Sequence, residues 1–244
     1  MKRSYIREIL DCIDDDTISF AGGLPNEELF DLEGITKATV KALQTSKSLQ
    51  YSKSQGLLGL REIIADIYTK IFDFKTSADE ILITTGSQQA FDVILKTFSK
   101  DEILVQNPSY IGAINAFKTM GLAVRGFDEI NELNDLLNSS NDLYLMSDFN
   151  NPTTKTYTLK QRKQIADILN KKGNILIEDG AYSLLDFENT IMKPISADYE
   201  NSFLLGSFSK ILAPGLRVGW IRANKKNIEK ILVSKEYLRR RQCV

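Results

Sequence analysis

Hydrophobic positions along the chain follow two different spacings, which predict helices in some segments and strands in others. Apolar residues recur every three or four positions from Leu57 to Ile71, and this spacing predicts a helix that ends near Phe72. Residues 1–16 and 35–45 are also expected to be helical. Short apolar runs later in the chain have the length of buried strands. The two spacings together predict a mixed α/β protein.

From residue 80 onward, predicted strands and helices alternate. Strands are expected at residues 80–84, 102–105, 123–127, 142–146, 174–178, 203–206 and 217–221. Helices are expected at residues 87–98, 109–120, 129–137, 159–172 and 225–240. This alternation predicts an α/β fold with a doubly wound, mostly parallel seven-stranded sheet.

Composition narrows the classes of function. The 244 residues are 43% hydrophobic with a net charge of -1, enough for one large domain or a domain plus a fragment, and with no sign of a nucleic-acid or membrane partner. The acidic, interrupted start does not resemble a signal peptide, and two cysteines near opposite ends fit a reduced, cytoplasmic setting. The chain has no histidine, so Ser-His-Asp and Cys-His nucleophiles and His-containing zinc sites are excluded.

The segment 207–220, SFSKILAPGLRVGW, carries the most specific chemistry. Lys210 lies between two apolar runs, and partial burial would lower the pKa of its amine and allow it to attack a carbonyl. Ser207, Ser209 and Arg217 are close enough in sequence to surround one anion, which Arg217 could bind in a bidentate manner. The alternative is a surface turn with a solvated lysine, and this segment alone does not decide between them.

Other polar residues follow predicted strands, where ligands bind in open α/β sheets. Ser87 and Gln88 open a helix whose free N–H groups could bind phosphate, although Ser87 could equally be a helix cap. Tyr110 could stack on a planar ring or simply be buried at a helix start. Asn151 could donate to a ring oxygen or belong to an ordinary Asn-Pro turn.

Asp179 follows a strongly apolar strand within the sequence EDGAY. A carboxylate at the end of a buried strand binds a metal or pairs with a buried cation. Without histidine or a further acidic cluster we expect no metal and favour a cation, such as a protonated heteroaromatic nitrogen. A phosphate, an aromatic ring with a phenolic oxygen and a basic nitrogen, and a carbonyl for Lys210 together describe pyridoxal 5'-phosphate.

The order and spacing of these motifs resemble the fold-type I, class I/II pyridoxal-phosphate-dependent aminotransferases, especially the 2-aminoadipate, kynurenine and aromatic aminotransferase group. MocR-type regulators share the same domain. The motifs are FAGGLPNEELF (20–30), YSKSQG (51–56), TTGSQQA (84–90), NPSY (107–110), NNPT (150–153), EDGAY (178–182) and GSFSK with APGLRVGW (206–220).

The resemblance implies a role for each matched residue. Lys210 forms a Schiff base with the cofactor and moves a proton between the substrate Cα and the cofactor C4'. Asp179 pairs with the pyridine nitrogen, Tyr182 and Asn151 hydrogen-bond the ring phenolate oxygen, and Tyr110 stacks on the ring. Lys210, Asp179 and Tyr182 are therefore the expected catalytic residues. The expected phosphate ligands are Ser87, Gln88, Ser207, Ser209 and Arg217.

The resemblance also implies an assembly and a domain plan. Tyr51 is expected to reach the phosphate of a neighbouring subunit in a homodimer, and Gly22, Gly23 and Asn151 are expected to contact substrate. Residues 1–34 would form an N-terminal segment and residues 35–244 the cofactor-binding large domain. The C-terminal small domain, which supplies the arginine for the substrate α-carboxylate, is expected to be absent, so the chain resembles a truncated member.

We therefore expect an aminotransferase that moves an amino group from an L-amino acid to a 2-oxo acid. The alternative is a catalytically impaired remnant that binds the cofactor, or a MocR-like effector domain. The short segment before Thr17 counts against the regulator, which needs an N-terminal DNA-binding domain. A β-lyase or decarboxylase on the same scaffold stays open, because all use the same lysine chemistry.

Overall fold

The computed structural model describes residues 14, 17–18, 23–98, 100–188 and 190–241. The helix expected over residues 1–16 falls almost wholly outside this range. Within it, the predicted alternation of strands and helices is confirmed. None of the helices formed by the described residues is long and apolar enough to cross a membrane.

One seven-stranded sheet forms the centre of the molecule, with the strand order β1-β7-β6-β5-β4-β2-β3. Its strands are β1 (Ile81–Thr84), β2 (Glu102–Gln106), β3 (Ala123–Phe127), β4 (Asn141–Leu145), β5 (Leu176–Asp179), β6 (Ser202–Ser207) and β7 (Gly219–Arg222). Only β7 runs antiparallel, to both of its neighbours. The carboxyl ends of the other six strands therefore meet at one edge, as the sequence predicts.

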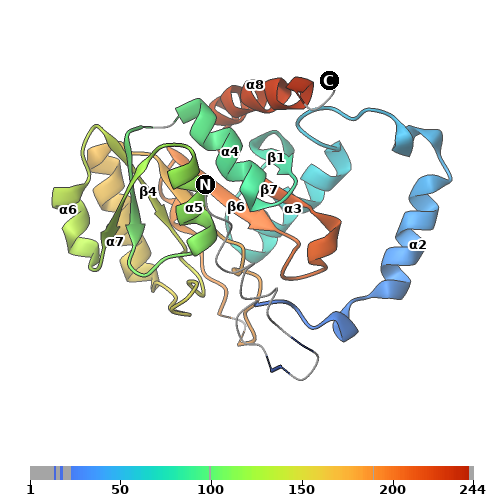
Figure 1. Cartoon of the computed structure of the whole chain (residues 1–244), viewed down its shortest axis with the longest axis horizontal. Coiled ribbons are helices and arrows are strands. Elements are labelled where there is room, and N and C mark those ends of the chain that lie inside the picture. Colours follow the sequence, from blue (N-terminus) through green and yellow to red (C-terminus); the bar gives the residue numbers. More distant parts are fainter. Residues whose placement is uncertain (1–13, 15–16, 19–22, 99, 189, 242–244) are drawn as a thin grey trace.

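Helices cover both faces of this sheet (Figure 1). The helices are α2 (Leu32–Leu43), α3 (Leu58–Ile71), α4 (Ser87–Phe98), α5 (Ile111–Thr119), α6 (Leu133–Leu136), α7 (Leu159–Lys172) and α8 (Lys225–Arg241). Helices α4, α5 and α8 pack on one face, while α7 and α3 pack on the other. This is the doubly wound arrangement expected from the sequence.

Side chains alternate between the two faces along each strand, and this decides where the acidic residues after β5 point. Tyr144 and Ile177 pack beneath α4 and α5, whereas Leu143 and Leu176 pack beneath α7. Because Asp179 lies two residues after Ile177, it shares the face of α4 and α5. Its neighbour Glu178 points to the opposite face.

Several predicted strand boundaries differ from the structure by one or two residues, and the difference before β7 has a clear local cause. The expected strand at 217–221 begins two residues later, at Gly219. Arg217 has a left-handed backbone conformation, with φ 53° and ψ 44°, at the end of the short 3-10 helix Pro214–Leu216. This conformation cannot belong to an extended strand, so Arg217 lies in the turn before β7.

Helix α2 contrasts with the other helices because none of its residues is buried. It stands away from the sheet at the side of the molecule in Figure 1. Its apolar side chains Leu32, Val40 and Leu43 are exposed. An amphipathic helix usually needs a partner surface for such side chains.

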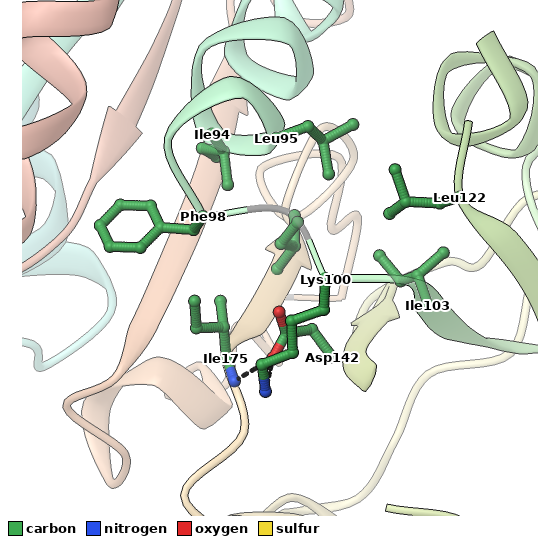
Figure 2. Close-up of a pocket in the computed structure, with 9 residues that line it drawn as sticks. Ile94, Leu95, Phe98, Lys100, Ile103, Leu122, Asp142 and Ile175 are labelled. Carbon is green, nitrogen blue, oxygen red and sulfur yellow. Dashed lines mark hydrogen bonds and ion pairs between the residues drawn. The ribbon is translucent and has the colours of Figure 1, made fainter. Parts of the chain in front are cut away.

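The amino edge of the sheet holds a small pocket between α4 and the starts of β2, β4 and β5 (Figure 2). Its walls are mostly aliphatic, with Ile94, Ile103 and Leu122 among them. Lys100 and Asp142 form an ion pair there at 2.9 Å, and the Ile175 N–H donates to the same carboxylate at 2.8 Å. The chain thus supplies both charges of this pair.

Candidate functional site at the carboxyl edge of the sheet

Asp179 is a buried carboxylate at the carboxyl edge, with 2% of its surface exposed. Its carboxylate accepts from the Tyr144 hydroxyl at 3.1 Å and from the Ala181 N–H at 3.2 Å. Burial raises the pKa of Asp179 to about 6, and these two hydrogen bonds oppose that shift only partly. No lysine or arginine among the described residues forms an ion pair with it. The site therefore contains a buried acceptor without a cation.

Two loops bring Asn151 and Tyr182 together beside this carboxylate. The Asn151 amide lies 3.5 Å from the Tyr182 hydroxyl and donates to it. Burial raises the pKa of the Tyr182 phenol, the Asn151 hydrogen bond lowers it, and the charge of Asp179 raises it again. The two polar groups converge at a distance that leaves each able to donate to a third oxygen atom.

Tyr110 lies at the start of α5 on the same side of the sheet. Its ring covers Gly112, where a Cβ atom would come within 2.3 Å of the ring carbon Cζ. Burial raises the pKa of the Tyr110 phenol, with Asp179 and Tyr182 adding to the shift and a hydrogen bond to Gln88 opposing it. Tyr110, Gln88, Asp179 and Tyr182 therefore belong to one electrostatic cluster.

Lys210 lies in the turn that follows β6, and it is half-buried. Its ammonium donates to the Gly23 carbonyl at 3.1 Å and lies 5.7 Å from the centre of the Tyr182 ring. Burial lowers the pKa of this ammonium. Lys210 is therefore partly withdrawn from water, unlike the solvated lysine that the alternative interpretation of this segment supposes.

A cradle for an anion lies next to this lysine, between Arg217 and the start of α4. Arg217 donates to the Thr85 carbonyl at 3.4 Å, and a Cβ atom on Gly86 would lie 2.8 Å from its Nη2 atom. Gly86 has φ +83°, and a Cβ atom on Gly219 would come within 2.8 Å of its Cα. Only glycine allows these segments to approach so closely. The guanidinium thus faces helix N–H groups that have no acceptor within α4.

Ser207 and Ser209 complete this cradle on the β6 side. Ser207 of β6 and Thr84 of β1 both pair with Gly219 of β7, one on each side of that strand. The Ser207 hydroxyl donates to the Ser209 hydroxyl at 2.9 Å, and the Ser209 N–H donates back to Ser207 at 3.1 Å. The two serines predicted to surround an anion with Arg217 are therefore held in one turn.

Two of the predicted site residues contribute little or nothing to this cluster, and a third falls outside the described residues. Tyr51 is 89% exposed, Gly22 lies outside the described residues, and Gly23 contributes only its carbonyl to Lys210. The sequence interpretation also missed Tyr144, because a tyrosine in the apolar run NDLYLM reads as core. Only the strand register reveals that Tyr144 faces Asp179.

The residues present fit pyridoxal phosphate. Asp179 offers an uncompensated buried carboxylate for a protonated ring nitrogen, and the glycine-lined cradle offers a cation and helix N–H groups for a phosphate. Asn151 and Tyr182 offer donors for a ring oxygen, and Lys210 offers an amine with a lowered pKa. Each chemical feature of the cofactor thus has a matching group along one edge of the sheet.

Comparison with known proteins agrees with this geometry. Aromatic-amino-acid aminotransferase 1 of Thermococcus litoralis is 36% identical over 97% of this chain. The solved α-aminoadipate aminotransferase of Thermus thermophilus, complexed with N-(5'-phosphopyridoxyl)-L-leucine, is 34% identical over 97% of this chain, with a TM-score of 0.85. An uncharacterised HTH-type transcriptional regulator of Bacillus subtilis, YisV, is 34% identical over 75% of this chain and is covered to 40% of its own length.

The chain spans 61% of the Thermococcus relative and 63% of the Thermus structure. The seven-stranded, mostly parallel sheet is the large-domain fold of these aminotransferases. Residues 17–240 match the family model for aminotransferase class I and II. The chain therefore belongs to the class I and II aminotransferase family.

Proposed function

We propose that this chain is the cofactor-binding domain of a pyridoxal-phosphate-dependent aminotransferase, which moves an amino group from an L-amino acid to a 2-oxo acid. The observation that carries the proposal is Asp179, buried at the carboxyl edge with only neutral hydrogen-bond donors around it. Family membership and the half-buried Lys210 support the same reaction class.

Each part of the site has a task in this proposal. When bound, pyridoxal phosphate supplies an aldehyde that condenses with amines and a ring that withdraws electrons from the bond being broken. Asp179 keeps a proton on the ring nitrogen, because its buried charge is stabilised by a cation at that position. Lys210 would hold the cofactor through its Nζ atom, and once the substrate amine has taken its place the released lysine amine would carry a proton to and from the substrate Cα.

The remaining residues orient the cofactor. The phosphate would lie between the β6–β7 turn and the start of α4. Its ligands there would be Arg217, Ser207, Ser209, Ser87 and Gln88. The ring is held by Tyr110 on its face and by Asn151 and Tyr182 at its phenolic oxygen. Since these groups come from the ends of several strands, the sheet itself fixes their spacing.

The assembly belongs to the proposal as well. A homodimer is supported by α2, whose residues are all unburied, and by the exposed Tyr51 beyond it, which we propose reaches the neighbouring subunit's phosphate. Residues 1–34 would border the substrate entrance with Gly22 and Gly23, and residues 35–244 would form the cofactor-binding domain. The two cysteines support a reduced, cytoplasmic setting.

A second candidate function is a domain that binds the cofactor without turnover, as a remnant or as a regulatory effector domain. The match to an HTH-type regulator favours this candidate, because the matching region makes up only 40% of that regulator. A half-reaction assay separates the two candidates. An enzyme loses the visible absorbance of its bound cofactor when glutamate or another amino acid is added, whereas a binding domain keeps it.

The cofactor proposal is tested by mixing the purified chain with pyridoxal phosphate. We expect a visible absorbance band, and borohydride reduction followed by peptide mass mapping should place the added mass on Lys210. Lys210→Ala should abolish both signals, while Lys155→Ala, at an exposed loop lysine, should keep them. A band of equal strength in Lys210→Ala would contradict the proposal.

A further inference from the structure

A second polar cluster lies beneath the candidate site, and the tasks described above do not use it. Asp148, Arg162 and Ser183 form this cluster, and all three are buried. Arg162 comes from α7, Asp148 from the loop after β4, and Ser183 from the loop after β5. Buried charges are costly unless they are paired and hydrogen-bonded, so such a cluster needs a reason.

Arg162 binds loop backbone at several points. Its guanidinium forms an ion pair with Asp148 and donates to the carbonyls of Ser147 at 3.1 Å, Tyr157 at 2.9 Å and Lys193 at 3.2 Å. Ser147 and Tyr157 lie at the two ends of the loop that carries Asn151. The Arg162 side chain therefore holds the base of that loop closed.

Ser183 connects this loop to the next one. Its hydroxyl donates to the Asp148 carboxylate at 2.7 Å. Ser183 directly follows Tyr182, so the Asp148 carboxylate ties the Tyr182 loop to the Asn151 loop. A short hydrogen bond to a buried charged group is worth more than one between neutral groups.

The two loops that Asp148 ties together carry the Asn151 amide and the Tyr182 hydroxyl of the candidate site. The Asn151 amide and the Tyr182 hydroxyl lie 3.5 Å apart, which is a long and weak hydrogen bond. Their own contact is therefore too weak to fix their separation. The hydrogen bond from Ser183 to Asp148 is shorter by 0.8 Å, taking the difference between 3.5 Å and 2.7 Å.

We propose that Asp148, Arg162 and Ser183 are positioning residues that lock the Asn151 and Tyr182 loops together, and so set the aim of both donors at the phenolic oxygen of the cofactor. The inference rests on the proposed function for the identity of that oxygen. The coupling of the two loops does not depend on it. Groups of this kind act by holding the residues that touch the ligand in a productive geometry.

Ser183→Ala is the sharpest test, because it removes one hydroxyl and leaves the Arg162–Asp148 ion pair intact. In the cofactor-loaded protein, we expect the midpoint of the pH titration of the visible absorbance to rise by about half to one pH unit. The reason is that poorly aimed donors stabilise the deprotonated ring oxygen less well. That oxygen then attracts a neighbouring proton more strongly.

Two further variants separate positioning from general stability. Ser202→Ala is the matched control, because it also removes a buried hydroxyl, which donates to the Tyr199 carbonyl at 2.7 Å near the amino edge of the sheet. It should lower stability without moving the titration midpoint. Ser183→Thr keeps the hydroxyl and should keep the wild-type midpoint; residue 183 borders a small hollow that is also lined by Leu184, Pro194 and Leu204.

A measurement without cofactor tests the coupling itself. In the cofactor-free chain, Ser183→Ala should raise amide hydrogen exchange in both loops, residues 149–157 and 181–185, by about fivefold or more, as expected for the loss of one such bond. Ser202→Ala should leave both loops unchanged. Exchange that rises only in residues 181–185, or a titration midpoint that moves equally in both variants, overturns the inference.

The two proposals can fail separately. If wild-type protein gives no visible band with pyridoxal phosphate and no borohydride-trapped mass on Lys210, the proposed function fails. The exchange experiment then decides the loop coupling alone. If the band forms but Ser183→Ala behaves like Ser202→Ala in both measurements, the positioning inference fails and the proposed function stands.

Discussion

Asp142 and Asp179 are both buried aspartates on adjacent strands, yet they lie at opposite edges of the sheet. Burial raises the pKa of each carboxyl. At the amino edge, Lys100 forms an ion pair with Asp142 and lowers its pKa again (Figure 2). At the carboxyl edge, the donors that the described residues offer to Asp179 are the Tyr144 hydroxyl and the Ala181 N–H.

The difference indicates which carboxylate belongs to the fold and which to a ligand. An ion pair whose two charges both come from the chain needs no ligand once the chain has folded. A buried carboxylate that lacks a cation raises the free energy of the folded state until a cation binds beside it. Asp142 is thus complete within the chain, whereas we propose that Asp179 marks a binding site.

Glu178 shows that a buried carboxylate in this chain can be satisfied by neutral donors alone. It is fully buried and accepts four hydrogen bonds, one from Ser147, one from the Ile195 N–H and two from Ser196. Asp179 accepts two within the described residues. The sheet thus directs a carboxylate with four hydrogen bonds to one face and a carboxylate with two to the other.

The largest expected effect comes from Asp179→Asn, which keeps the size of the side chain and removes its charge. We expect the affinity for pyridoxal phosphate at neutral pH to fall by about 100- to 1,000-fold, because the buried partner of the ring cation is lost. The cofactor-free variant should nevertheless be more stable than wild type. Equilibrium binding by absorbance and thermal unfolding without cofactor measure the two effects.

Asp142→Asn is the matched comparison for this experiment. It should leave cofactor affinity unchanged and lower the unfolding temperature, the reverse of Asp179→Asn. If Asp179→Asn destabilised the cofactor-free chain and bound cofactor normally, Asp179 would be another structural residue. The contrast between the two edges would then be lost.

The pH dependence of stability should give the next largest effect. The folded pKa of Asp179, about 6, lies above the ordinary aspartate value of 3.8, so the folded chain holds this proton more tightly than the unfolded chain. Its stabilising contribution is full below about pH 4 and disappears as the pH rises through about 6. The loss amounts to about 2–3 kcal/mol by pH 7.

Urea unfolding of cofactor-free wild type and Asp179→Asn at a series of pH values measures this contribution. The difference in unfolding free energy, wild type minus variant, should decrease between pH 4 and pH 7. Taking the difference removes the titration of Asp142, which burial shifts in the same direction. A difference that stayed constant across this range would mean that Asp179 is solvated in the folded chain.

Most of the fold could be predicted from the sequence because hydrophobic spacing determines the elements. The helix at 87–98 and the strand at 123–127 match the structure at both ends. The error at Arg217 has a local physical cause, since a left-handed residue between apolar neighbours leaves no trace in the hydrophobic pattern. The pattern also predicted α2 as a helix, although it could not reveal that none of the residues of this helix is buried among the described residues.

The site could be predicted only in part, because sequence spacing and spatial contact differ. Lys210, Asp179 and Arg217 are recognisable from their positions after or between apolar runs. Tyr144 and Ser183 are not, since each reads as an ordinary core or loop residue until strand register and loop folding bring it to a carboxylate. Contacts between residues more than thirty positions apart depend on the whole sheet.

The smallest expected effect is the stability loss in Asp142→Asn, which we place at about 1–2 kcal/mol. The loss is moderate because 29% of the Lys100 side chain stays exposed to water and its ammonium keeps a hydrogen bond to the Asn141 carbonyl at 2.9 Å. Asp92→Asn, which breaks the more exposed ion pair with Lys96, is the control and should change stability by less than about 0.5 kcal/mol. Urea unfolding of both variants at neutral pH compares them directly. Equal losses would mean that burial adds nothing to the Lys100–Asp142 pair, and that the amino edge is no more complete than an exposed helix surface.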